Sequence, residues 1–388
     1  MKIISVVGAR PNFMKIAPFI REITHYNKNH SNYNNYLLDH ILVHTGQHYD
    51  DRMSKSFFKA LDIPEANINL GIGSGSHAYQ VGTTMIEFEK VLEKEKPDWI
   101  VVLGDVNSTL ACSVTAKKQN VKVCHIEAGL RSNDMTMPEE INRLVTDRLS
   151  DLLLTPDEIS VKNLLNEGVD KRKIKFVGNI MIDTLEANRK KAEALNIPEI
   201  IESNLFKDGS YNRNYNNIDE FVLMTLHRPS NVDDKSLLMP IIDLLTSEIA
   251  DQLPIIWPVH PRAKKQLENF GLWEQLRNHK NVFLLEPLGY IEMLKLNINA
   301  RVMLTDSGGL QEECNVLNTP CLTLRWNTER PVTLRENGGV SVLVGNDINL
   351  IKREFYNVMK NKYKARVPEF WDGQTAGRCL KSIIEYKQ

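Results

Sequence analysis

The sequence has no long apolar segment. Its 388 residues contain no run of the roughly 18 apolar residues that a membrane-spanning helix needs. The N-terminal residues MKIISVVGARPN enter a strand-like segment directly, without the cationic region, long apolar stretch and cleavage site of a secretory signal. We therefore expect a cytoplasmic protein with no membrane partner.

Paired cysteines and an excess of charge are also missing. The five cysteines show neither CxxC pairing nor regular spacing. This argues against a disulfide framework or a structural zinc site and favours reduced cysteines in the core. The formal net charge of −1 at pH 7 gives no reason to expect a nucleic-acid partner.

The common nucleotide and metal motifs are absent as well. Neither a Walker A motif nor a GxGxxG fingerprint is present, and GIGSGS (71–76) only imitates the second, because Ser76 stands where the third glycine is needed. The sequence has no DxD pair and no His/Cys cluster with the spacing of metal ligands. It therefore favours chemistry without a metal.

What the sequence does have is a regular alternation of short apolar runs with helix-like segments. The runs are rich in Val, Ile and Leu without polar alternation, which is typical of strands buried on both faces of a parallel sheet. A first series comprises residues 2–8, 38–46, 98–105, 121–127, 152–157 and 173–179, and a second 221–228, 253–261, 282–288, 301–309, 319–325 and 340–347.

Two domains follow from these two series and from a length that exceeds one ordinary core. We predict an α/β protein with two doubly wound, Rossmann-like domains, residues 1–180 and 181–369, which contain parallel sheets and face each other across a cleft. The Asn-rich stretch 193–220 is expected to be a loop region near the boundary. Since loops leave the C-terminal ends of the strands on the cleft side, the cleft is the expected ligand site.

Polar residues gather where the predicted strands end. Asp105 comes directly after a buried strand, and GARPN (8–12) places Arg10 in a turn with Lys15 one helical turn further on. TDSGGLQEE (305–313) can expose backbone N–H groups at a helix start, where a phosphate binds. An ordinary serine cap with glycines for a tight turn explains the same residues equally well.

Acidic and imidazole side chains add to this pattern. Glu312 and Glu313 would repel a phosphate, but one of them is suited to accept hydrogen bonds from a sugar diol. A single histidine at a strand end is more often structural than functional. The two pairs His227–Arg228 and His260–Arg262 stand at equivalent strand ends, however, and together suit an anionic ligand such as a diphosphate.

These residues belong to motifs that occur together in one family. The motifs, in chain order, are GARPNFMKIAP, HTGQHYD, LGDVNSTLA, HIEAGLRS, PEEINR, VGNIMIDTL, HRPSN, TDSGGLQEE and TLRWNTERP. With them, the chain resembles the non-hydrolysing UDP-N-acetylglucosamine 2-epimerases from end to end. The resemblance implies the two-domain glycosyltransferase-B architecture, with a C-terminal helix at about residues 370–388 packing back on the first domain.

The resemblance also implies an activity. Members of this family interconvert UDP-N-acetylglucosamine (UDP-GlcNAc) and UDP-N-acetylmannosamine (UDP-ManNAc) at C2, without NAD or a metal, and form homodimers. UDP is eliminated across C1–C2 to give 2-acetamidoglucal, and is then re-added with a proton on the opposite face of C2. Such chemistry needs acid–base groups near the sugar and a firmly held diphosphate leaving group.

The family's site residues carry over by motif. The resemblance implies catalytic roles near the sugar, with base and acid left unassigned, for Asp105, Glu127, Glu139 and His227. It implies contacts to the substrate and its phosphates for Arg10, Lys15, Arg143, Arg228, His260, Ser307, Gly308, Gly309 and Arg325, and to the ribose for Glu313. The neighbouring Asp134 and Glu140 are expected to be surface or capping residues.

Some features depart from the family or leave alternatives open. HRPSN (227–231) stands where many bacterial members read HRREN, and HTGQHYD (44–50) has no clear counterpart for the rest of their activating second site, so substrate activation is left open. One alternative is a 2-epimerase for a modified substrate, such as a UDP-2,3-diacetamido uronic acid. The others are a glycosyltransferase of the same fold and a non-catalytic nucleotide-sugar sensor.

Overall fold

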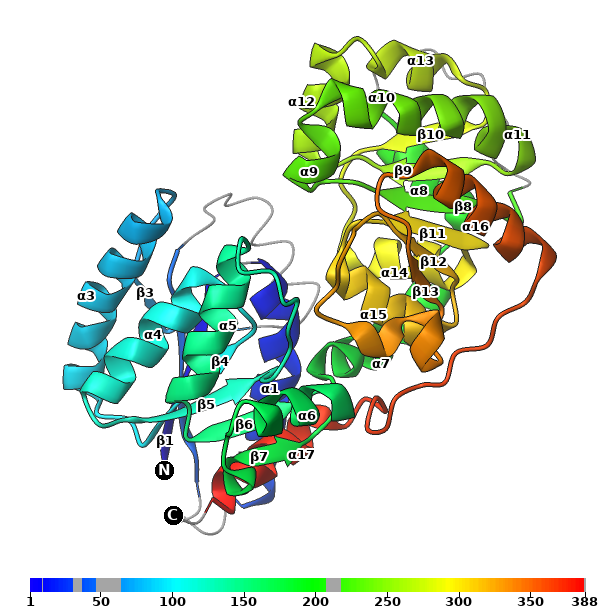
Figure 1. The fold of residues 1–388 in the computed structure, drawn as a ribbon. Coiled ribbons are helices and arrows are strands. Elements are labelled where there is room, and N and C mark those ends of the chain that lie inside the picture. Colours follow the sequence, from blue (N-terminus) through cyan, green and yellow to red (C-terminus); the bar gives the residue numbers. More distant parts are fainter. Residues whose placement is uncertain (9, 31–36, 47–63, 207–217, 387–388) are drawn as a thin grey trace. The chain divides into compact units, whose positions relative to one another are not determined.

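The computed structural model describes residues 1–8, 10–30, 37–46, 64–206 and 218–386. The chain divides into two compact units (Figure 1). Unit 1 consists of Met1–Ala187 and Pro368–Gln388, and unit 2 of Asn188–Val367. We describe each unit by itself.

Unit 1 is built on a parallel sheet of seven strands in the order β3-β2-β1-β4-β5-β6-β7. The strands are β1 (Lys2–Val7), β2 (Asp39–His44), β3 (Ile68–Asn69), β4 (Trp99–Leu103), β5 (Lys122–Ile126), β6 (Leu152–Thr155) and β7 (Ile174–Phe176). The helices are α1 (Arg10–Asn29), α3 (His77–Glu95), α4 (Asn107–Lys118), α5 (Pro138–Leu149), α6 (Glu158–Asn166), α7 (Ile180–Glu193, whose last residues belong to unit 2) and α17 (Thr375–Ile384).

Unit 2 repeats this plan with a six-stranded sheet in the order β10-β9-β8-β11-β12-β13. Its strands are β8 (Val222–Thr225), β9 (Ile255–Pro258), β10 (Val282–Leu285), β11 (Val302–Thr305), β12 (Cys321–Thr323) and β13 (Ser341–Leu343). Its helices are α8 (Ile197–Asn204), α9 (Pro229–Val232), α10 (Lys235–Leu244), α11 (Ala250–Gln252), α12 (Pro261–Asn269), α13 (Trp273–Asn278), α14 (Tyr290–Asn299), α15 (Gly308–Leu317) and α16 (Ile348–Lys360).

The apolar runs explain both sheets. Every residue of β4 and of β11 is buried, because helices cover both faces of a parallel sheet and leave no strand face for water. All paired strands within the two sheets run parallel. The prediction of an α/β protein with doubly wound parallel sheets is confirmed, and the five cysteines are buried and free, as expected.

One segment differs from its prediction. Within the Asn-rich stretch 193–220, expected to be a loop region, Ile197–Asn204 form α8. Asn196 caps this helix by accepting a hydrogen bond from Glu199 N at 3.3 Å, and Ile200 and Ile201 are buried beneath it. The segment thus contributes two residues to the core although its composition is largely polar. Residues 207–217 lie outside the described part of the structure.

The strand order locates the expected ligand sites. In both units the direction of strand addition reverses, between β1 and β4 in unit 1 and between β8 and β11 in unit 2. Connections from such neighbouring strands leave to opposite faces of the sheet, so a crevice opens at their C-terminal ends, where doubly wound folds bind ligands. Each unit therefore has one such place.

The C-terminal segment completes unit 1. Helix α17 packs beside α1 (Figure 1). Its first turn is capped by Asp183 of α7, whose carboxylate accepts from Thr375 N at 3.0 Å and Ala376 N at 2.7 Å. Just before the helix, Trp371 donates from its indole nitrogen to Pro156 O at 2.8 Å.

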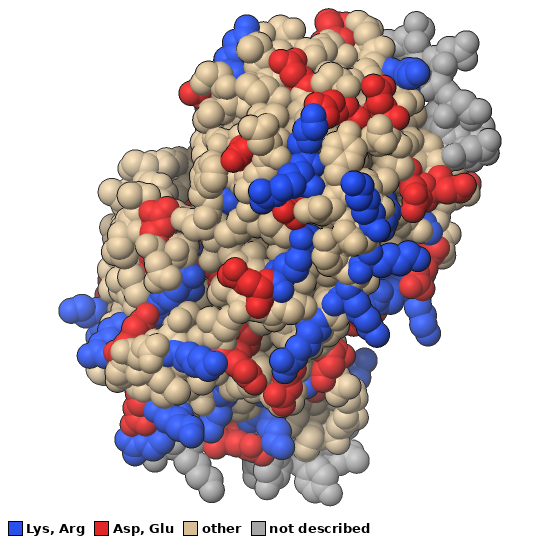
Figure 2. All heavy atoms as spheres, turned by 45° about the vertical axis from the view of Figure 1, so that its right-hand side comes forward, with Lys and Arg blue, Asp and Glu red and all other residues tan. Residues whose placement is uncertain are grey.

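No single sign of charge dominates the face of the molecule shown in Figure 2. On the face shown in Figure 2, basic and acidic side chains are interspersed over most of the area, which agrees with the net charge near zero. Among the residues that the structure describes, no helix is both long and apolar enough to span a bilayer.

Candidate active site

The first group of predicted residues lies at the C-terminal ends of β1, β4 and β5 in unit 1. Asn12, in the first turn of α1, connects two of these strands. Its Nδ2 donates to Leu103 O at 2.9 Å, and its Oδ1 accepts from Gly8 N at 3.3 Å. The start of α1 is thereby fixed against the end of β4.

Lys15 and Glu127 meet at this point. Lys15 Nζ pairs with Glu127 Oε2, and only 9% and 2% of the two side chains are exposed. Gly104 makes room for the pair, since a Cβ there would lie 3.2 Å from Lys15 Nζ and 3.4 Å from Glu127 Oε2. With φ at +64°, this position also favours glycine for its backbone. Residues from three strand ends thus converge on one buried ion pair.

Glu127 is strained in two ways. Its φ is +72°, in the left-handed region that residues other than Gly, Asn and Asp seldom adopt. Its Oε1 is buried and has no hydrogen-bond partner among the described residues. Backbone strain and an unsatisfied buried oxygen each cost free energy, and their coincidence at one residue is typical of functional sites.

Asp105 is held next to this pair by a buried arginine. Arg143, with 2% of its side chain exposed, donates from Nη1 to Asp105 Oδ2 and from Nε to Glu140 Oε2 at 2.8 Å. Asn142 donates to the Asp105 carbonyl oxygen at 2.8 Å. Because 26% of the Asp105 side chain is exposed, its carboxylate is fixed in orientation and still accessible.

Glu140 was expected to be a surface or capping residue, and the expectation of a surface position is wrong. Only 2% of it is exposed, and it accepts from Ser132 N at 3.0 Å and Asn133 N at 2.9 Å. Burial would raise the pKa of Glu140, but the hydrogen bonds from Ser132 and Arg143 outweigh it and leave the pKa below its ordinary value. Glu140 is therefore an ionised support for the loop and for Arg143. Asp134 does cap its turn, by accepting from Thr136 N at 3.0 Å.

For two further predicted residues, no contact with this group is described. Glu139 is half-buried in the first turn of α5, where the positive end of the helix dipole favours a carboxylate. Within the described ranges it makes no hydrogen bond or ion pair. Arg10 begins α1, but its side chain lies outside the described part of the structure, as do residues 47–50 of the HTGQHYD motif.

The second group lies at the ends of β8 and β11 in unit 2, and its centre is a residue that the sequence did not single out. Asp306 is fully buried and binds His227 Nδ1 at 2.8 Å. It also accepts from His227 N at 3.0 Å, Arg228 N at 2.8 Å and Asn231 Nδ2 at 3.1 Å. Burial would raise the pKa of Asp306, but the hydrogen bond and charge of His227 outweigh it and leave the pKa below its ordinary value.

This arrangement fixes the imidazole of His227. With Nδ1 turned to Asp306, the ring presents Nε2, and 40% of the side chain is exposed. The His260 ring lies 5.6 Å away between centroids, and its Nδ1 accepts from Arg262 N at 3.2 Å as the cap of α12. The guanidinium of Arg262 pairs instead with the partly exposed Asp233 at 2.5 Å.

The start of α15 combines both explanations given for TDSGGLQEE. Ser307 is the N-cap, and its hydroxyl accepts from Leu310 N at 3.5 Å. A Cβ on Gly309 would meet nothing within 4 Å, whereas one on Gly308 would lie 2.9 Å from Glu329 Oε1. A Cβ on Gly308 would therefore press against the buried Glu329 carboxylate. Gly309 leaves open space at a helix start, where the first N–H groups of a helix have no partner within the helix.

Buried charges lie behind this helix start. Arg325 donates from Nη2 to Glu329 at 2.6 Å, and Arg330 pairs with Glu329 and, at 2.8 Å, with Glu312. The Nη1 of Arg325 is buried without a partner among the described residues, and it would lie 3.4 Å from a Cβ on Gly308. One guanidinium N–H group is therefore unsatisfied beside the first turn of α15.

Glu313 lies deeper in unit 2, with 2% of its surface exposed. Burial raises the pKa of Glu313 to about 7, the charge of Glu312 acts in the same direction, and hydrogen bonding by Tyr290 and Asn297 acts against it. The carboxyl group is therefore close to half-protonated at neutral pH. Its predicted contact with a ribose stays a prediction.

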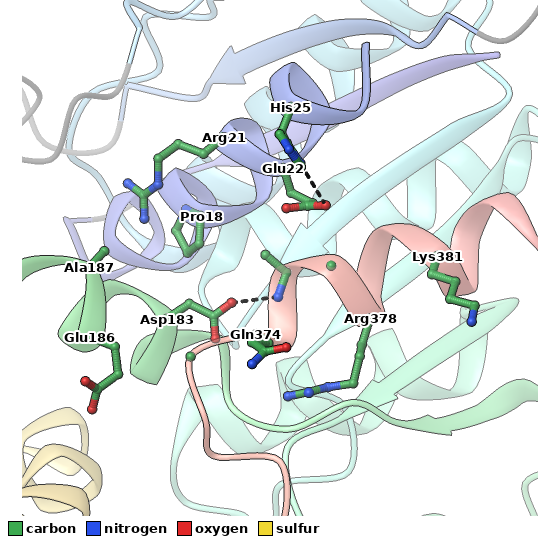
Figure 3. A pocket seen from close by; sticks show the side chains of 13 residues that line it. Pro18, Arg21, Glu22, His25, Asp183, Glu186, Ala187, Gln374, Arg378 and Lys381 are labelled. Carbon is green, nitrogen blue, oxygen red and sulfur yellow. Dashed lines mark hydrogen bonds and ion pairs between the residues drawn. The ribbon is translucent and has the colours of Figure 1, made fainter. Parts of the chain in front are cut away.

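A separate hollow in unit 1 contains none of the predicted residues. It has a volume of 720 Å³ and lies between α1, α7 and α17 (Figure 3). Acidic and basic side chains from these helices line it, among them Glu22, Asp183 and Arg378. Within the described residues, no group of three or more His, Cys, Asp and Glu side chains is placed to hold a metal ion.

Comparison with known proteins places the chain in a family. A profile of the family described as "UDP-N-acetylglucosamine 2-epimerase" matches residues 31–384. The UDP-N-acetylglucosamine 2-epimerase of Methanocaldococcus jannaschii is 42% identical, covering 100% of this chain and 99% of that protein. The crystal structure of the M. jannaschii UDP-GlcNAc 2-epimerase in complex with UDP-GlcNAc and UDP aligns over 100% of both chains, with 40% identity and a TM-score of 0.86.

Two further similarities show the breadth of the match. The UDP-2,3-diacetamido-2,3-dideoxy-D-glucuronate 2-epimerase of Pseudomonas aeruginosa is 38% identical over 89% of this chain and 88% of its own. The lipopolysaccharide outer core galactosyltransferase WaaB covers 99% of both chains with a TM-score of 0.55 but only 12% identity, so it shares the glycosyltransferase-B fold alone. The resemblance seen in the sequence is confirmed, and the chain belongs to the UDP-N-acetylglucosamine 2-epimerase family.

Proposed function

We propose that the protein interconverts UDP-GlcNAc and UDP-ManNAc at C2, by eliminating UDP to give 2-acetamidoglucal and adding it back. The observation that carries this proposal is the group at the strand ends of unit 1. Glu127 is held there in a strained backbone beside Lys15, and Asp105 is oriented by the buried Arg143. These are oriented carboxylates of the kind that a proton transfer at carbon requires.

The chemistry needs two acid–base events. In elimination, a base takes the proton from C2 while the bond between C1 and the UDP oxygen breaks, and the electron pair of C2–H forms the C1–C2 double bond. In re-addition, an acid delivers a proton to the other face of C2 as UDP returns to C1. We propose that Asp105, Glu127 and Glu139 supply these groups near the sugar, with His227 assisting.

The leaving diphosphate needs a firm hold, which we assign to unit 2. Three features support this: the open space beside Gly309 at the start of α15, the unsatisfied Nη1 of Arg325, and the Asp306-oriented ring of His227. Backbone N–H groups at a helix start and a guanidinium are suited to bind phosphate oxygens. Arg228 and His260 are proposed to add further contacts, and Glu313 to bind the ribose.

Solvent exchange tests the proposed reaction. The protein is incubated with UDP-GlcNAc in D2O, and the products are analysed by NMR and mass spectrometry. We expect UDP-ManNAc with deuterium at C2, and deuterium at C2 of the recovered UDP-GlcNAc. Absence of C2 exchange would falsify the proposal. Release of UDP that depends on an added acceptor would point to a glycosyltransferase, and binding without turnover to a sensor.

A modified sugar is the second candidate substrate, because the P. aeruginosa relative, named for a UDP-2,3-diacetamido uronate, is 38% identical to this chain. The same exchange experiment with that sugar nucleotide separates the two. If kcat/KM is higher for the uronate, the substrate assignment changes while the chemistry at C2 stays.

We also propose that the protein acts as a homodimer, which light scattering on the purified protein will test.

A further inference from the structure

A buried histidine lies directly beneath the candidate carboxylates of unit 1. His125, in β5, is 0% exposed, and both of its ring nitrogens face oxygen atoms that can only accept. Nδ1 lies 2.6 Å from Asp147 Oδ1, and Nε2 lies 2.9 Å from the carbonyl oxygen of Gly104. Two hydrogen bonds of this kind require a proton on each nitrogen, so the ring is an imidazolium paired with a carboxylate.

The partners of Asp147, on α5, favour its ionised form. Its Oδ2 accepts from Gly129 N at 3.0 Å and from Arg131 Nη1 at 2.7 Å. Burial would raise the pKa of Asp147, but the charges and hydrogen bonds of His125 and Arg131 outweigh it and leave the pKa below its ordinary value. Arg131 is in turn held by Glu167 at 2.7 Å. Both ring nitrogens of His125 and both carboxylate oxygens of Asp147 therefore have partners, and the two side chains are buried.

The two ends of this network hold the two turns that carry the candidate carboxylates. His125 binds Gly104, the residue before Asp105, and Asp147 binds Gly129, two residues after Glu127. Gly104, Glu127 and Gly129 all have positive φ angles, of +64°, +72° and +84°. Backbone hydrogen bonds hold part of these turns, from Gly104 N to Ile126 O at 3.2 Å and from Glu127 N to Leu154 O at 3.1 Å. The carbonyl oxygen of Gly104 and the N–H group of Gly129 are bound by side chains instead, those of His125 and Asp147.

We infer that His125 and Asp147 are positioning residues, which clamp the turns of Asp105 and Glu127 at a fixed separation through a buried, hydrogen-bonded pair. This inference rests on the proposed function, since it concerns the same site. Neither side chain touches the substrate. Their effect is to keep two carboxylates in register with C2 of the sugar, where a displacement of about 1 Å costs about 10²-fold in rate.

Two variants and a matched control test the clamp. His125→Gln keeps one donor for Gly104 but loses the charge, and Asp147→Asn keeps the shape but loses the anion. The control is Asp151→Asn at the opposite end of β5, where Asp151 accepts from Val123 N and Lys117 Nζ at 2.9 Å each. All three variants remove a charged group that belongs to β5 or hydrogen-bonds to it.

We expect His125→Gln and Asp147→Asn to lower kcat by about 10²-fold with little change in KM or in the Kd for UDP. Asp151→Asn should keep the wild-type kcat, although its Tm falls. This separation of kcat from KM and Tm is not expected of a residue that only stabilises the fold. Wild-type kcat in either folded clamp variant, or an equal loss of kcat in Asp151→Asn, overturns the inference.

A spectroscopic measurement covers the case in which both variants fail to fold. In wild-type protein with 15N-labelled histidine, we expect one ring with a hydrogen-bonded proton on each nitrogen. A set of rings none of which carries both protons in hydrogen bonds overturns the inference. If instead the wild-type protein shows no C2 exchange, the proposed function fails, and the ring measurement still decides whether the charged clamp exists.

Discussion

At the scale of single residues, Glu127 lowers the free energy of unfolding in two ways. A left-handed backbone costs a side-chain residue about 1–2 kcal/mol, and a buried oxygen without a partner costs about 1–3 kcal/mol more. Lys15 offsets part of this through its ion pair. A residue selected only for folding would carry neither cost, so the arrangement supports a role in which the carboxylate meets a substrate.

Isosteric amides at the two unit 1 carboxylates test this role. We expect Glu127→Gln and Asp105→Asn each to lower kcat by about 10²- to 10⁴-fold, the usual contribution of a general acid or base, while UDP still binds. Asp134→Asn, on the loop after Glu127, should keep normal turnover because the Asp134 carboxylate caps its own turn by accepting from Thr136 N. Wild-type kcat in Glu127→Gln and Asp105→Asn would remove both residues from the mechanism.

Glu313 leads to a prediction about pH. Because its folded-state pKa of about 7 lies above the ordinary 4.5, the folded state binds the proton more tightly. The associated stability is complete below about pH 4.5 and is lost as the pH rises through 7. Glu313→Gln stays neutral, so at about pH 8 it should be more stable than wild type by about 3 kcal/mol, and nearly equal at about pH 4.5.

Urea unfolding at the two pH values measures this difference. Glu312→Gln is the control with the opposite sign, because Glu312 pairs with Arg330 at 2.8 Å and its loss should destabilise the protein at about pH 8. A stability of Glu313→Gln that falls with pH as steeply as that of wild type would contradict the prediction. If Glu313 binds the ribose, Glu313→Gln should also weaken UDP binding, which calorimetry measures separately.

The sequence singled out candidate site residues but not the residues that support them. Asp105, Glu127 and His227 were predicted because they follow buried strands within a recognisable set of motifs. His125, Asp147 and Asp306 were not singled out, since sequence spacing does not reveal that a charged side chain is buried against a partner from another element. Glu140 was misjudged for the same reason, since its burial depends on Arg143 and on the loop that it holds.

At the scale of elements, the two glycines in the first turn of α15 are expected to differ in role, with Gly308 important for packing and Gly309 for the proposed binding of phosphate. Gly308→Ala places a methyl group 2.9 Å from Glu329 Oε1 in the buried charge cluster, and should cost about 1–3 kcal/mol of stability. Gly309→Ala meets nothing within 4 Å and should leave Tm unchanged or slightly raised. It should nevertheless weaken UDP binding by at least about tenfold, or about 1.4 kcal/mol, by occupying the space assigned to the phosphates.

Differential scanning calorimetry and titration calorimetry on the two variants measure these effects. If Gly309→Ala binds UDP as tightly as wild type, the diphosphate does not lie at this helix start. If Gly308→Ala has an unchanged Tm, the charge cluster adapts without cost.

The regular elements were predictable where composition and period agree. The long strands follow from apolar runs such as WIVVL in β4. The two-residue β3 could not be found, because so short a pairing depends on β2 beside it rather than on its own sequence. Helix α8 was missed, because its buried Ile200 and Ile201 stand in a polar, Asn-rich context.

At the scale of the whole molecule, unit 1 depends on a helix from the far end of the chain. In α17, Ile383 is 1% exposed and its neighbour Ile384 is 38% exposed. We expect Ile383→Ala to destabilise the protein by about 2–5 kcal/mol, as is usual for a buried isoleucine. Ile384→Ala, one residue away, should change stability by less than about 0.5 kcal/mol. Chemical denaturation of both variants measures the contrast, and similar losses would mean that the C-terminal helix is not packed as described.

The division of unit 1 between Met1–Ala187 and Pro368–Gln388 also affects the order in which the protein is made. During translation, the whole of unit 2 is synthesised after the main body of unit 1 and before α17. At about 5–20 residues per second, the nascent first unit waits roughly ten to forty seconds for the helix that covers it. During this time the surface that receives α17 is uncovered, so the ribosome-bound chain is expected to need a chaperone most at this stage of synthesis.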